Sequence, residues 1–290
     1  MSITAADVAK LRTLTGAGMM DCKKALDEAN GDMEKAGEIL RKKGIVKAAK
    51  RTDKIAAEGT TQVKVNGDTA VVLEVNSETD FVAQNEDFKK MVENFADALL
   101  EQKPQSLEGA MAVTAGGKTL QEHLNDLTAK IGEKISLRRF MVVEKTAGDV
   151  FGAYSHLGGR ISVLVVLKNS THAGLAADIA MHAAASNPKY ISRDQVPAGI
   201  VEKEKEIYVE QLKQQGKPEA AIPNILKGKL DKFYSEICLM EQAFIKDEEK
   251  TVQKLLGESM SVATMVRFEL GEGIEKEKTD FAAEVEAQLK

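Results

Sequence analysis

The feature that most constrains the fold of this 290-residue chain is an internal repeat. A shift of 93 residues places VVLEVNS at 71–77 on LVVLKNS at 164–170. Each segment follows a shorter apolar segment across a turn, and the first turn carries Asn66-Gly67, a pair typical of tight hairpins. A helical pattern follows each hairpin. This duplication predicts two related α+β halves, each a small antiparallel sheet backed by helices.

Further segments complete the two halves. Helices are predicted after the hairpins, with apolar positions over 81–99 in the first half and over 174–185 in the second. Residues 135–143 and 262–270 predict the strands that close the sheets. In the second half, residues 188–228 lie between the helix and the closing strand, and they are charged and helical. This insertion predicts a helical arm that is either a self-contained hairpin or packs against another surface.

The N-terminal residues predict a small helical domain. Residues 1–44 contain three short helical patterns, with Thr4 and Asp32 placed to cap the first and third helices and Gly44 placed to end the third. Residues 41–54 then hold seven basic side chains and one acidic one. This run indicates a solvated helical linker or a contact with an acidic surface. The lack of interleaved aromatic residues weakens the case for RNA binding.

Composition narrows the classes of function. The net charge of −5 gives no electrostatic case for general binding to nucleic acid or to an anionic membrane. The two cysteines, Cys22 and Cys238, lie far apart and outside any CxxC pair, so neither a disulfide framework nor a thiolate metal site is expected. The sequence has no run long enough to span a membrane and no secretory signal, which predicts a cytoplasmic protein.

Signatures of catalysis fail when their spacing is checked. The segment AGGKT at 115–119 resembles the end of a phosphate-binding loop, but Ala112 stands where the first glycine is required. The four histidines form no HExxH pair. His182 is expected to pack in the core, whereas His156, in a predicted turn, is either an ordinary polar residue or a contact residue. We expect no catalytic site, cofactor or metal site.

The segment SETDFVAQNEDF at 77–88 places an aromatic residue where a helix usually meets solvent. A strand-like run ends before it, and Thr79 or Asp80 can cap the helix that begins there. Phe81 then occupies the first turn of that helix. Its ring either folds back onto the core or is displayed to a surface outside the chain.

Two long segments, LRTLTGAGMMDCKKAL at 11–26 and EVNSETDFVA at 74–83, closely resemble signatures of the bacterial elongation factor Ts family. HAAASNP at 182–188 and RFELGEGIE at 267–275 also look like family segments. The resemblance covers essentially the whole chain. It departs from the family at 241–244 (EQAF), where a proline usually precedes the aromatic residue, and this departure puts only a local turn in doubt.

The resemblance implies an α+β fold with a ubiquitin-associated-like (UBA-like) three-helix domain, a duplicated core, an inserted helical coil of the type used in dimer contacts, and a C-terminal helical module. The expected boundaries are 1–54 for the UBA-like domain and linker, 55–145 for the core N-subdomain, 146–187 and 229–270 for the core C-subdomain, 188–228 for the coil, and 271–290 for the C-terminal module.

The resemblance also implies a function. The family is the guanine-nucleotide exchange factor for the translational GTPase elongation factor Tu, without catalytic chemistry of its own. The expected partner is therefore elongation factor Tu, in its GDP-bound and nucleotide-free states, with a homodimer through 188–228 as a further possibility. Neither a membrane nor direct binding of nucleic acid is expected.

In the family, the motif that matches Thr79, Asp80, Phe81 and Val82 enters the GTPase near its Mg²⁺ site, which accounts for an exposed ring at Phe81. Other contacts implied by the resemblance come from the N-terminal unit, a loop and the hairpin turn, and the residues are Met19, Met20, Ile131, Gly132 and His156. The two methionines can instead belong to the core of the small N-terminal domain.

Two other classes of function stay open at the level of sequence. The three-helix unit can serve a ubiquitin-binding or peptide-binding adaptor, in which case Phe81 is buried and the core is passive. The basic run at 41–54 can serve an RNA-binding translation protein, which a salt-titrated RNA-binding assay would distinguish.

Overall fold

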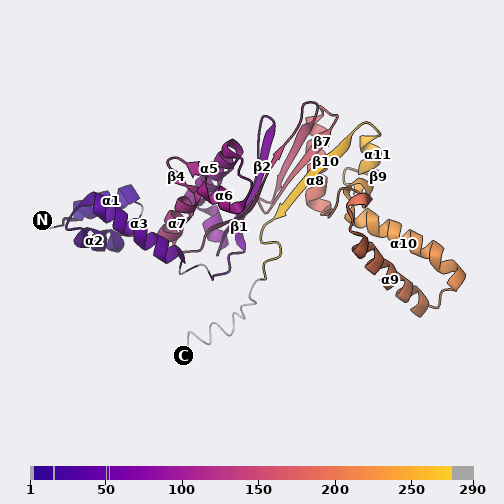
Figure 1. Ribbon diagram of the computed structural model, residues 1–290, viewed down its shortest axis with the longest axis horizontal. Helices are drawn as coiled ribbons and strands as arrows, with labels where there is room; N and C mark the ends of the chain where they lie inside the picture. Colours follow the sequence, from indigo (N-terminus) through magenta and orange to yellow (C-terminus); the bar gives the residue numbers. More distant parts are fainter. Residues whose placement is uncertain (1–2, 16, 50, 52, 276–290) are drawn as a thin grey trace. The chain divides into compact units, whose positions relative to one another are not determined.

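The computed structural model describes residues 3–15, 17–49, 51 and 53–275 (Figure 1). The chain forms two compact units. The first contains the residues up to 61, then 73–142 and those from 269 on, and the second contains 62–72 and 143–268. Helices and small sheets make up both units, which confirms the α+β class. The finer domain boundaries expected from the sequence remain predictions.

The N-terminal residues form the three predicted helices, α1 (Ala5–Thr15), α2 (Met19–Glu28) and α3 (Met33–Ala49). Both expected caps are present. The Thr4 hydroxyl accepts the N–H of Asp7 at 3.2 Å, and an Asp32 oxygen accepts the N–H groups of Glu34 and Lys35 at 3.0 and 3.1 Å. The helices enclose a small apolar core of Val8, Leu11, Cys22, Ala25, Leu26, Ala29 and Ala36.

The predicted end of the third helix at Gly44 is wrong, because α3 continues to Ala49. A single glycine inside a helix costs only about 1 kcal/mol, and the alanine-rich and lysine-containing residues that follow are good helix formers. The helix packs on this side against α7 (Leu120–Ile131), where Gly44 lies close to Ala129. Packing therefore extends the helix beyond the glycine.

The first sheet has the strand order β1-β2-β5. Its strands are β1 (Glu58–Asn66), β2 (Thr69–Ser77) and β5 (Ser136–Glu144), as the hairpin and closing-strand patterns predict. The turn between β1 and β2 places Gly67 at φ 58°, which a glycine adopts without strain. The strand order makes β2, the second strand of the hairpin, central in the sheet, and β2 is buried along nearly all of its length.

One helix was predicted after this hairpin, and the structure has two, α4 (Asp80–Gln84) and α5 (Glu86–Gln102). Asn85 separates them, because its side chain accepts the N–H groups of Asp87 and Phe88 at 2.8 and 3.4 Å and so begins a new helix. Helices α6 (Leu107–Ala112) and α7 then complete this layer.

The AGGKT segment forms a turn rather than a phosphate-binding loop. Gly116 and Gly117, both with positive φ, join the two-residue strands β3 (Thr114–Ala115) and β4 (Lys118–Thr119). The Thr119 hydroxyl then caps α7 in a capping box with Glu122.

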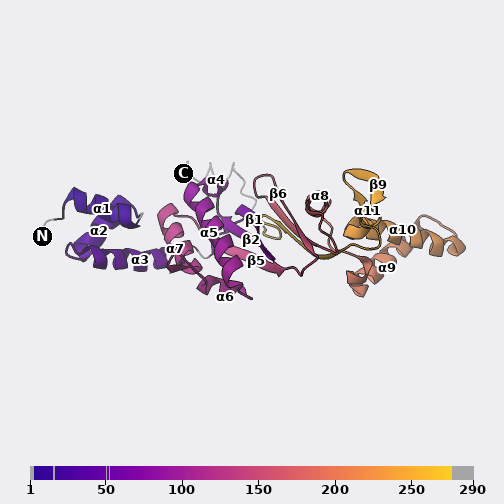
Figure 2. The same cartoon turned by 90° about the horizontal axis from the view of Figure 1, so that it is seen from above.

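The second sheet repeats the topology of the first, with the order β10-β7-β6. Strands β6 (Val150–His156) and β7 (Ile161–Lys168) form an antiparallel hairpin in which Val150 pairs with Leu167, and β10 (Ser261–Glu269) closes the sheet. Helix α8 (Ala173–Ser186) packs on β6 and β7 (Figure 2). A central second strand in both sheets confirms the predicted duplication.

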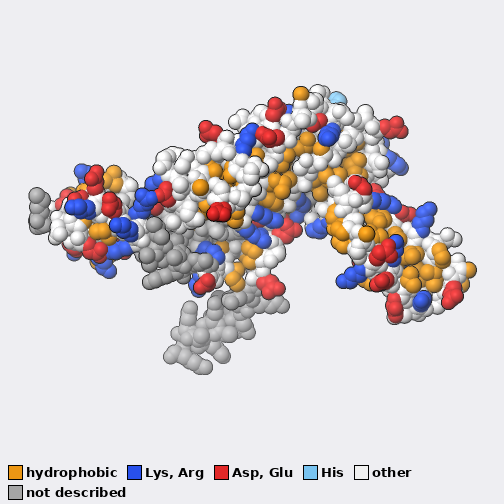
Figure 3. Space-filling view, viewed as in Figure 1, with side chains coloured by type: hydrophobic (Ala, Val, Ile, Leu, Met, Phe, Trp, Pro, Cys, Tyr) orange, Lys and Arg blue, Asp and Glu red, His pale blue; other side chains and the backbone are white. Residues whose placement is uncertain are grey.

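The insertion forms two helices, α9 (Ala198–Gln214) and α10 (Ile222–Ile237), that pack side by side (Figure 1). The helical arm was predicted to end at Gly228, but α10 passes through that glycine, because apolar residues continue at helical spacing at Leu226, Leu230 and Phe233. Hydrophobic side chains gather on the visible face of this pair at the lower right of Figure 3. Throughout α10, all of which is described, no residue is fully buried.

Gln242 forms hydrogen bonds that hold the C-terminal end of α10. It lies in the segment where the sequence departs from the family. The Gln242 amide donates to the carbonyls of Glu236 and Ser186 at 2.9 and 3.3 Å, and its oxygen accepts from Nε2 of His182 at 3.0 Å. His182 is fully buried, which confirms its prediction as a core histidine. Short elements then lead back to β10, namely β8 (Ala243–Phe244), β9 (Asp247–Thr251) and α11 (Val252–Leu256). The C-terminal helical module predicted at 271–290 lies outside the described residues from 276 onward.

Candidate protein-binding site

Phe81 lies in the first turn of α4 with 84% of its surface exposed. Its neighbour Val82 is buried and anchors the helix to the first unit. Because adjacent residues on a helix point in different directions, burying Val82 turns the Phe81 ring outward. The exposure of this ring agrees with what the family resemblance implies, and its role as a contact stays a prediction.

Thr79 precedes α4 in the N-cap position, but its side chain makes no capping hydrogen bond within the described chain. Both the Thr79 N–H and its hydroxyl donate instead to the carboxylate of Glu133, at 3.0 Å to Oε2 and 2.8 Å to Oε1. Glu133 is 54 residues away in sequence. The expectation that Thr79 or Asp80 caps the helix through its side chain is therefore wrong for Thr79.

The loop that supplies Glu133 also carries Ile131 and Gly132. Ile131 ends α7, and Gly132 follows it at φ 87°, a conformation that favours glycine, with its N–H donating to the Thr128 carbonyl at 2.8 Å. The structure thus brings the 79–82 segment and the 131–132 segment, predicted separately from the resemblance, to one place in the first unit.

The neighbouring residues Glu78 and Lys134 form a second link, in which the acceptor lies on the side of β2 and the donor on the side of the loop after α7. A Glu78 oxygen accepts the N–H of Lys134 at 2.6 Å. The guanidinium of Arg51 also donates to both Glu78 oxygens, at 2.9 and 3.1 Å. Glu78, Thr79, Glu133 and Lys134 therefore form a reciprocal set of bonds between the end of β2 and the loop after α7, which we call the carboxylate clamp.

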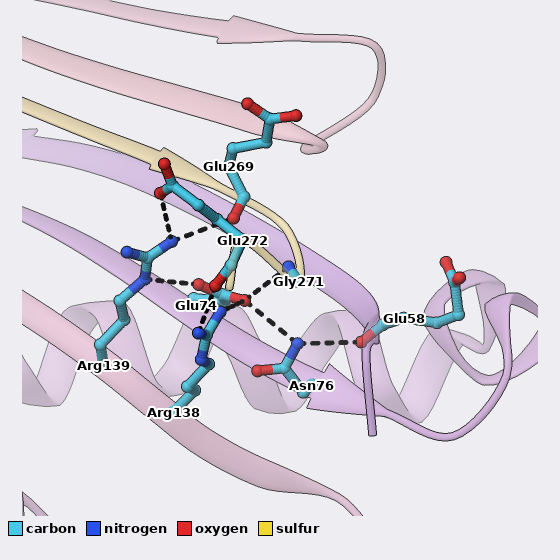
Figure 4. Close-up of polar contacts among 8 residues, drawn as sticks. All are labelled: Glu58, Glu74, Asn76, Arg138, Arg139, Glu269, Gly271 and Glu272. Carbon is cyan, nitrogen blue, oxygen red and sulfur yellow. Dashed lines mark hydrogen bonds and ion pairs between the residues drawn. The ribbon is translucent and has the colours of Figure 1, made fainter. Parts of the chain in front are cut away.

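Strand β2 behind this site contains a fully buried carboxylate, Glu74 (Figure 4). It accepts from Arg138 at 3.0 Å, from Arg139 at 2.5 Å and from the N–H of Gly271 at 2.9 Å. Burial by itself would raise the pKa of Glu74, but the Gly271 N–H and the two arginines outweigh it and hold the pKa below its ordinary value. Glu74 is therefore ionised in the interior.

The two arginines also hold the segment that follows β10. Arg138 donates to the carbonyl of Glu272, and Arg139 donates to the Glu269 carbonyl at 3.0 Å and pairs with the Glu272 carboxylate at 3.3 Å (Figure 4). Sequence reasoning missed this network. The available signal was a lone acidic residue, Glu74, inside an otherwise apolar strand.

The remaining predicted contacts lie elsewhere on the chain. Met19 and Met20 begin α2 and are both exposed, Met20 at 64%, so they are not part of the apolar core of the N-terminal domain. His156 ends β6 in the second unit, is exposed and stacks on Tyr154 with ring centroids 5.9 Å apart. Beside it, the exposed Leu157 has φ 49°, an uncommon conformation for leucine that sequence reasoning did not single out.

Among residues 3–275, with the gaps given above, no three His, Cys, Asp or Glu side chains are grouped as a metal site. In that same part of the chain, no helix is both long and apolar enough to cross a bilayer. Cys22 and Cys238 are free and buried, and burial raises the pKa of the Cys238 thiol to about 11.

One comparison with known proteins bears on this site. A family model described as "Elongation factor TS" matches residues 78–272. The match begins at Glu78 in the carboxylate clamp and ends at Glu272 in the arginine network. It includes Phe81, the 131–134 loop and His156, and it leaves out the three N-terminal helices with Met19 and Met20.

Proposed function

The chain belongs to the elongation factor Ts family, which acts in the elongation phase of protein synthesis, and we propose that it is the guanine-nucleotide exchange factor for elongation factor Tu. It binds the GDP-bound GTPase and promotes release of GDP, which allows GTP to bind. The chain supplies no catalytic chemistry, because exchange requires only that the affinity for nucleotide be changed.

The observation that carries the proposal is the exposure of Phe81 on a helix that is fixed at its start. A ring that is 84% exposed keeps a large apolar surface in water, and burying such a ring in a partner's pocket is favourable by about 2 kcal/mol. Aromatic anchors of this kind dominate many protein interfaces. The ring is thus suited to insertion into the GTPase.

The proposed mechanism acts on the support of the bound Mg²⁺. GDP is held in a GTPase by phosphate contacts and by coordination to a bound Mg²⁺. Phe81 inserts near that site, shifts the groups that position the metal and weakens GDP binding. Thr79 and Asp80 begin the helix that presents the ring, and the buried Val82 anchors that helix. Each 1.4 kcal/mol of weakening speeds release by about tenfold if association is unchanged.

Linkage sets the direction of the cycle. The exchange factor favours the opened GTPase, so bound nucleotide must lower the affinity for the exchange factor by the same factor. Abundant GTP therefore expels the exchange factor and completes the exchange. No covalent step is required at any point.

The other predicted residues make further contacts with the GTPase in this proposal. Met19 and Met20 offer flexible apolar side chains at the start of α2, and Ile131 and Gly132 flank the carboxylate clamp. His156 would contact the GTPase from the hairpin turn of the second unit. A homodimer through the helical insertion remains a separate prediction, which the dependence of sedimentation on protein concentration would test.

The two other classes of function receive less support. The adaptor class requires a buried Phe81, and the ring is exposed. The RNA-binding class depends on the seven basic side chains at 41–54, and three of them, Arg41, Lys43 and Arg51, pair with Glu122, Glu28 and Glu78.

The proposal is tested by the rate of GDP release from elongation factor Tu, measured with a fluorescent GDP analogue at rising concentrations of this protein. The intact chain should accelerate release strongly. The Phe81→Ala variant should lose at least about tenfold in the maximal rate, with a smaller effect on the half-saturating concentration, because the other contacts keep the complex together.

Leu107→Ala is the matched control, since Leu107 is also an exposed apolar residue on a short helix of the first unit. It should accelerate release as the intact chain does. Equal maximal rates for the Phe81→Ala variant and the intact chain would remove Phe81 from the mechanism. No acceleration by the intact chain would refute the proposed function.

A further inference from the structure

We propose that Glu133 is a positioning residue that fixes the orientation of the Phe81 ring through Thr79. The structural part of this inference concerns the free protein and stands independently, whereas its kinetic part rests on the proposed function. Glu133 does not reach the ring itself. It holds the residue on which the short helix carrying the ring begins.

Helix α4 cannot hold Phe81 rigidly by itself. It has five residues, and isolated helices shorter than about 12 residues are marginal in water. Asn85 breaks the helix before α5, so α4 does not continue into the longer helix. The anchors of the ring are therefore the buried Val82 on one side and the attachment of Thr79 on the other.

That attachment consists of three contacts to one carboxylate. The Thr79 N–H donates to Glu133 Oε2 at 3.0 Å, and the hydroxyl lies 2.8 Å from Oε1 and 3.1 Å from Oε2. Hydrogen bonds to an ionised acceptor are about twice as strong as neutral ones. Bonds from both the backbone and the side chain fix the position and rotation of Thr79, and hence the direction in which α4 begins.

The rest of the carboxylate clamp makes the arrangement reciprocal. Glu78, next to Thr79, accepts the N–H of Lys134, next to Glu133, at 2.6 Å. Two adjacent residues on each side are thus bonded across the same gap. This pairing resists both sliding and twisting of the 78–79 segment against the loop, which a single bond would not.

The value of this arrangement lies in preorganisation. A side chain that is already oriented loses less freedom on binding, and ordering one such side chain typically changes affinity by about two- to tenfold. In the proposed mechanism the ring enters its pocket in the step that weakens GDP binding, after the other contacts have formed, so the cost of ordering it falls on that step. Removing Glu133 should therefore lower the maximal rate of GDP release by a factor in that range, with little change in half-saturation. The loop residues Ile131 and Gly132, attached to the same clamp, would lose their alignment with the ring as well.

The chain contains no tryptophan, so the Phe81→Trp variant carries a single indole reporter at the ring position. Time-resolved fluorescence anisotropy then measures the local motion of residue 81 in the free protein, without any partner. Glu133→Ala in this background should increase the fast local motion of the indole. Glu133→Gln, which keeps one acceptor oxygen, should restore part of the order.

Glu122→Ala is the matched control for this measurement. Glu122 is also a glutamate bonded to a threonine N–H, at 2.9 Å to Thr119, and it lies at the other end of α7. It should leave the motion at residue 81 unchanged, although it removes a capping bond. Circular dichroism establishes that each variant is folded, and Thr79→Val, which removes only the hydroxyl, replaces Glu133→Ala if that variant does not fold.

The kinetic test compares the maximal rate of GDP release with the half-saturating concentration for Glu133→Ala, Thr79→Val and the double variant, each with Phe81 intact. A positioning role predicts a lower maximal rate, little change in half-saturation and a double variant no worse than Glu133→Ala alone. Unchanged indole motion in the folded Glu133→Ala or Thr79→Val variant would overturn the inference. Increased motion with an unchanged maximal rate would uphold the positioning of the ring and count instead against the wedge role of Phe81.

Discussion

Positions 74 and 167 are equivalent in the two halves of the core, yet the first is a buried glutamate and the second a buried leucine. Leu167 lies in an apolar cluster with Val163, Val165 and residues of α8. Glu74 lies among Arg138, Arg139 and the Gly271 N–H. The same strand position therefore supports packing in one half and a charged network in the other.

The helix starts that follow these strands differ in the same way. The 93-residue shift places Thr79 on His172 and Phe81 on Gly174. In the second half α8 runs unbroken for 14 residues from Ala173. In the first half the helix is broken at Asn85, and Glu133 holds its start.

These differences indicate how a duplicated fold can divide its work. The second half uses an unbroken helix on an apolar strand, which is the simplest way to stabilise a small sheet. The first half instead uses hydrogen bonds and ion pairs between distant residues, and this half carries the exposed aromatic ring. The comparison predicts that exchanging residues between the halves is harmful, because each depends on its own surroundings.

The largest effect is expected from exchanging the two strand residues. Leu167→Glu would bury a carboxylate among apolar side chains without a partner, which should destabilise the fold by more than about 4 kcal/mol at pH 7. Glu74→Leu should cost about 3 kcal/mol, since Arg138 and Arg139 lose the carboxylate that they share, although both are partly exposed to water and Arg139 keeps its ion pair with Glu272. Urea denaturation followed by circular dichroism measures both changes.

Glu74→Gln keeps the shape of the side chain and removes only its charge, so it serves as the control for the first half. It should lie between the intact chain and Glu74→Leu. If Glu74→Leu were as stable as the intact chain, the charged network would contribute nothing to folding and the contrast between the halves would disappear.

A smaller effect is expected at a glycine that the two halves share. Gly59 and Gly152 are equivalent under the 93-residue shift. A Cβ at Gly59, which has φ 124°, would lie 2.2 Å from the Val75 carbonyl oxygen, and one at Gly152 would lie 2.0 Å from that of Ala176. Alanine at either position should cost about 1–3 kcal/mol, because the backbone atoms that it meets must move.

The control is Gly174→Ala in the first turn of α8. Apart from its chain neighbours and the backbone of its own helix, no described atom lies within 4 Å of a Cβ placed at Gly174. Alanine is also a better helix former than glycine. This variant should be neutral or slightly stabilising in the same urea titration. Equal stability of the Gly59→Ala and Gly174→Ala variants would show that the first-half glycine is not required by its backbone.

The regular part of the fold could be predicted from the sequence because its signals are local. Alternating apolar residues and a two-residue turn define the hairpins, and the repeat supports the same strand order twice. The errors came where two local signals competed. Asn85 is a good helix cap, but Phe81 and Phe88 keep a seven-residue spacing that is typical of one continuous helix. Gly44 and Gly228 read as helix ends, and packing or continued apolar spacing carries both helices past them.

The candidate site could be predicted only in part. The sequence placed Phe81 in a first turn but left open whether the ring faces inward or outward, and the burial of Val82 decides this. Glu74 stands out in the sequence only as a lone acidic residue in an apolar strand, and the bonding partners of Glu133 and Glu74 could not be found in this way. Their partners are 54 to 197 residues away, and such bonds depend on tertiary packing that no local pattern encodes.

The smallest predicted effect is a difference in how the two halves respond to acid. His182 in the second half has a pKa below its ordinary value of 6.5, because burial disfavours the charged ring more than its bond to Gln242 favours it. Glu74 in the first half has a pKa below its ordinary value of 4.5. In both cases the unfolded chain takes up protons at a higher pH than the folded chain, so stability falls as pH is lowered.

The two losses occupy different pH ranges. The contribution of His182 is complete above pH 6.5 and declines as pH falls from there through its lowered pKa, whereas that of Glu74 persists until the pH falls below 4.5. Each unit of depression corresponds to about 1.4 kcal/mol. In urea titrations the free energy of unfolding of the intact chain should therefore be lower at pH 5.5 than at pH 7.5. This loss should be smaller in His182→Gln, because glutamine remains neutral and can still donate and accept a hydrogen bond. Glu74→Gln should retain the loss. The proton would be taken up at Nδ1 of His182, which accepts the Ile245 N–H at 3.2 Å in the folded protein. An equal loss of stability in the His182→Gln variant and the intact chain would show that another group causes the acid sensitivity.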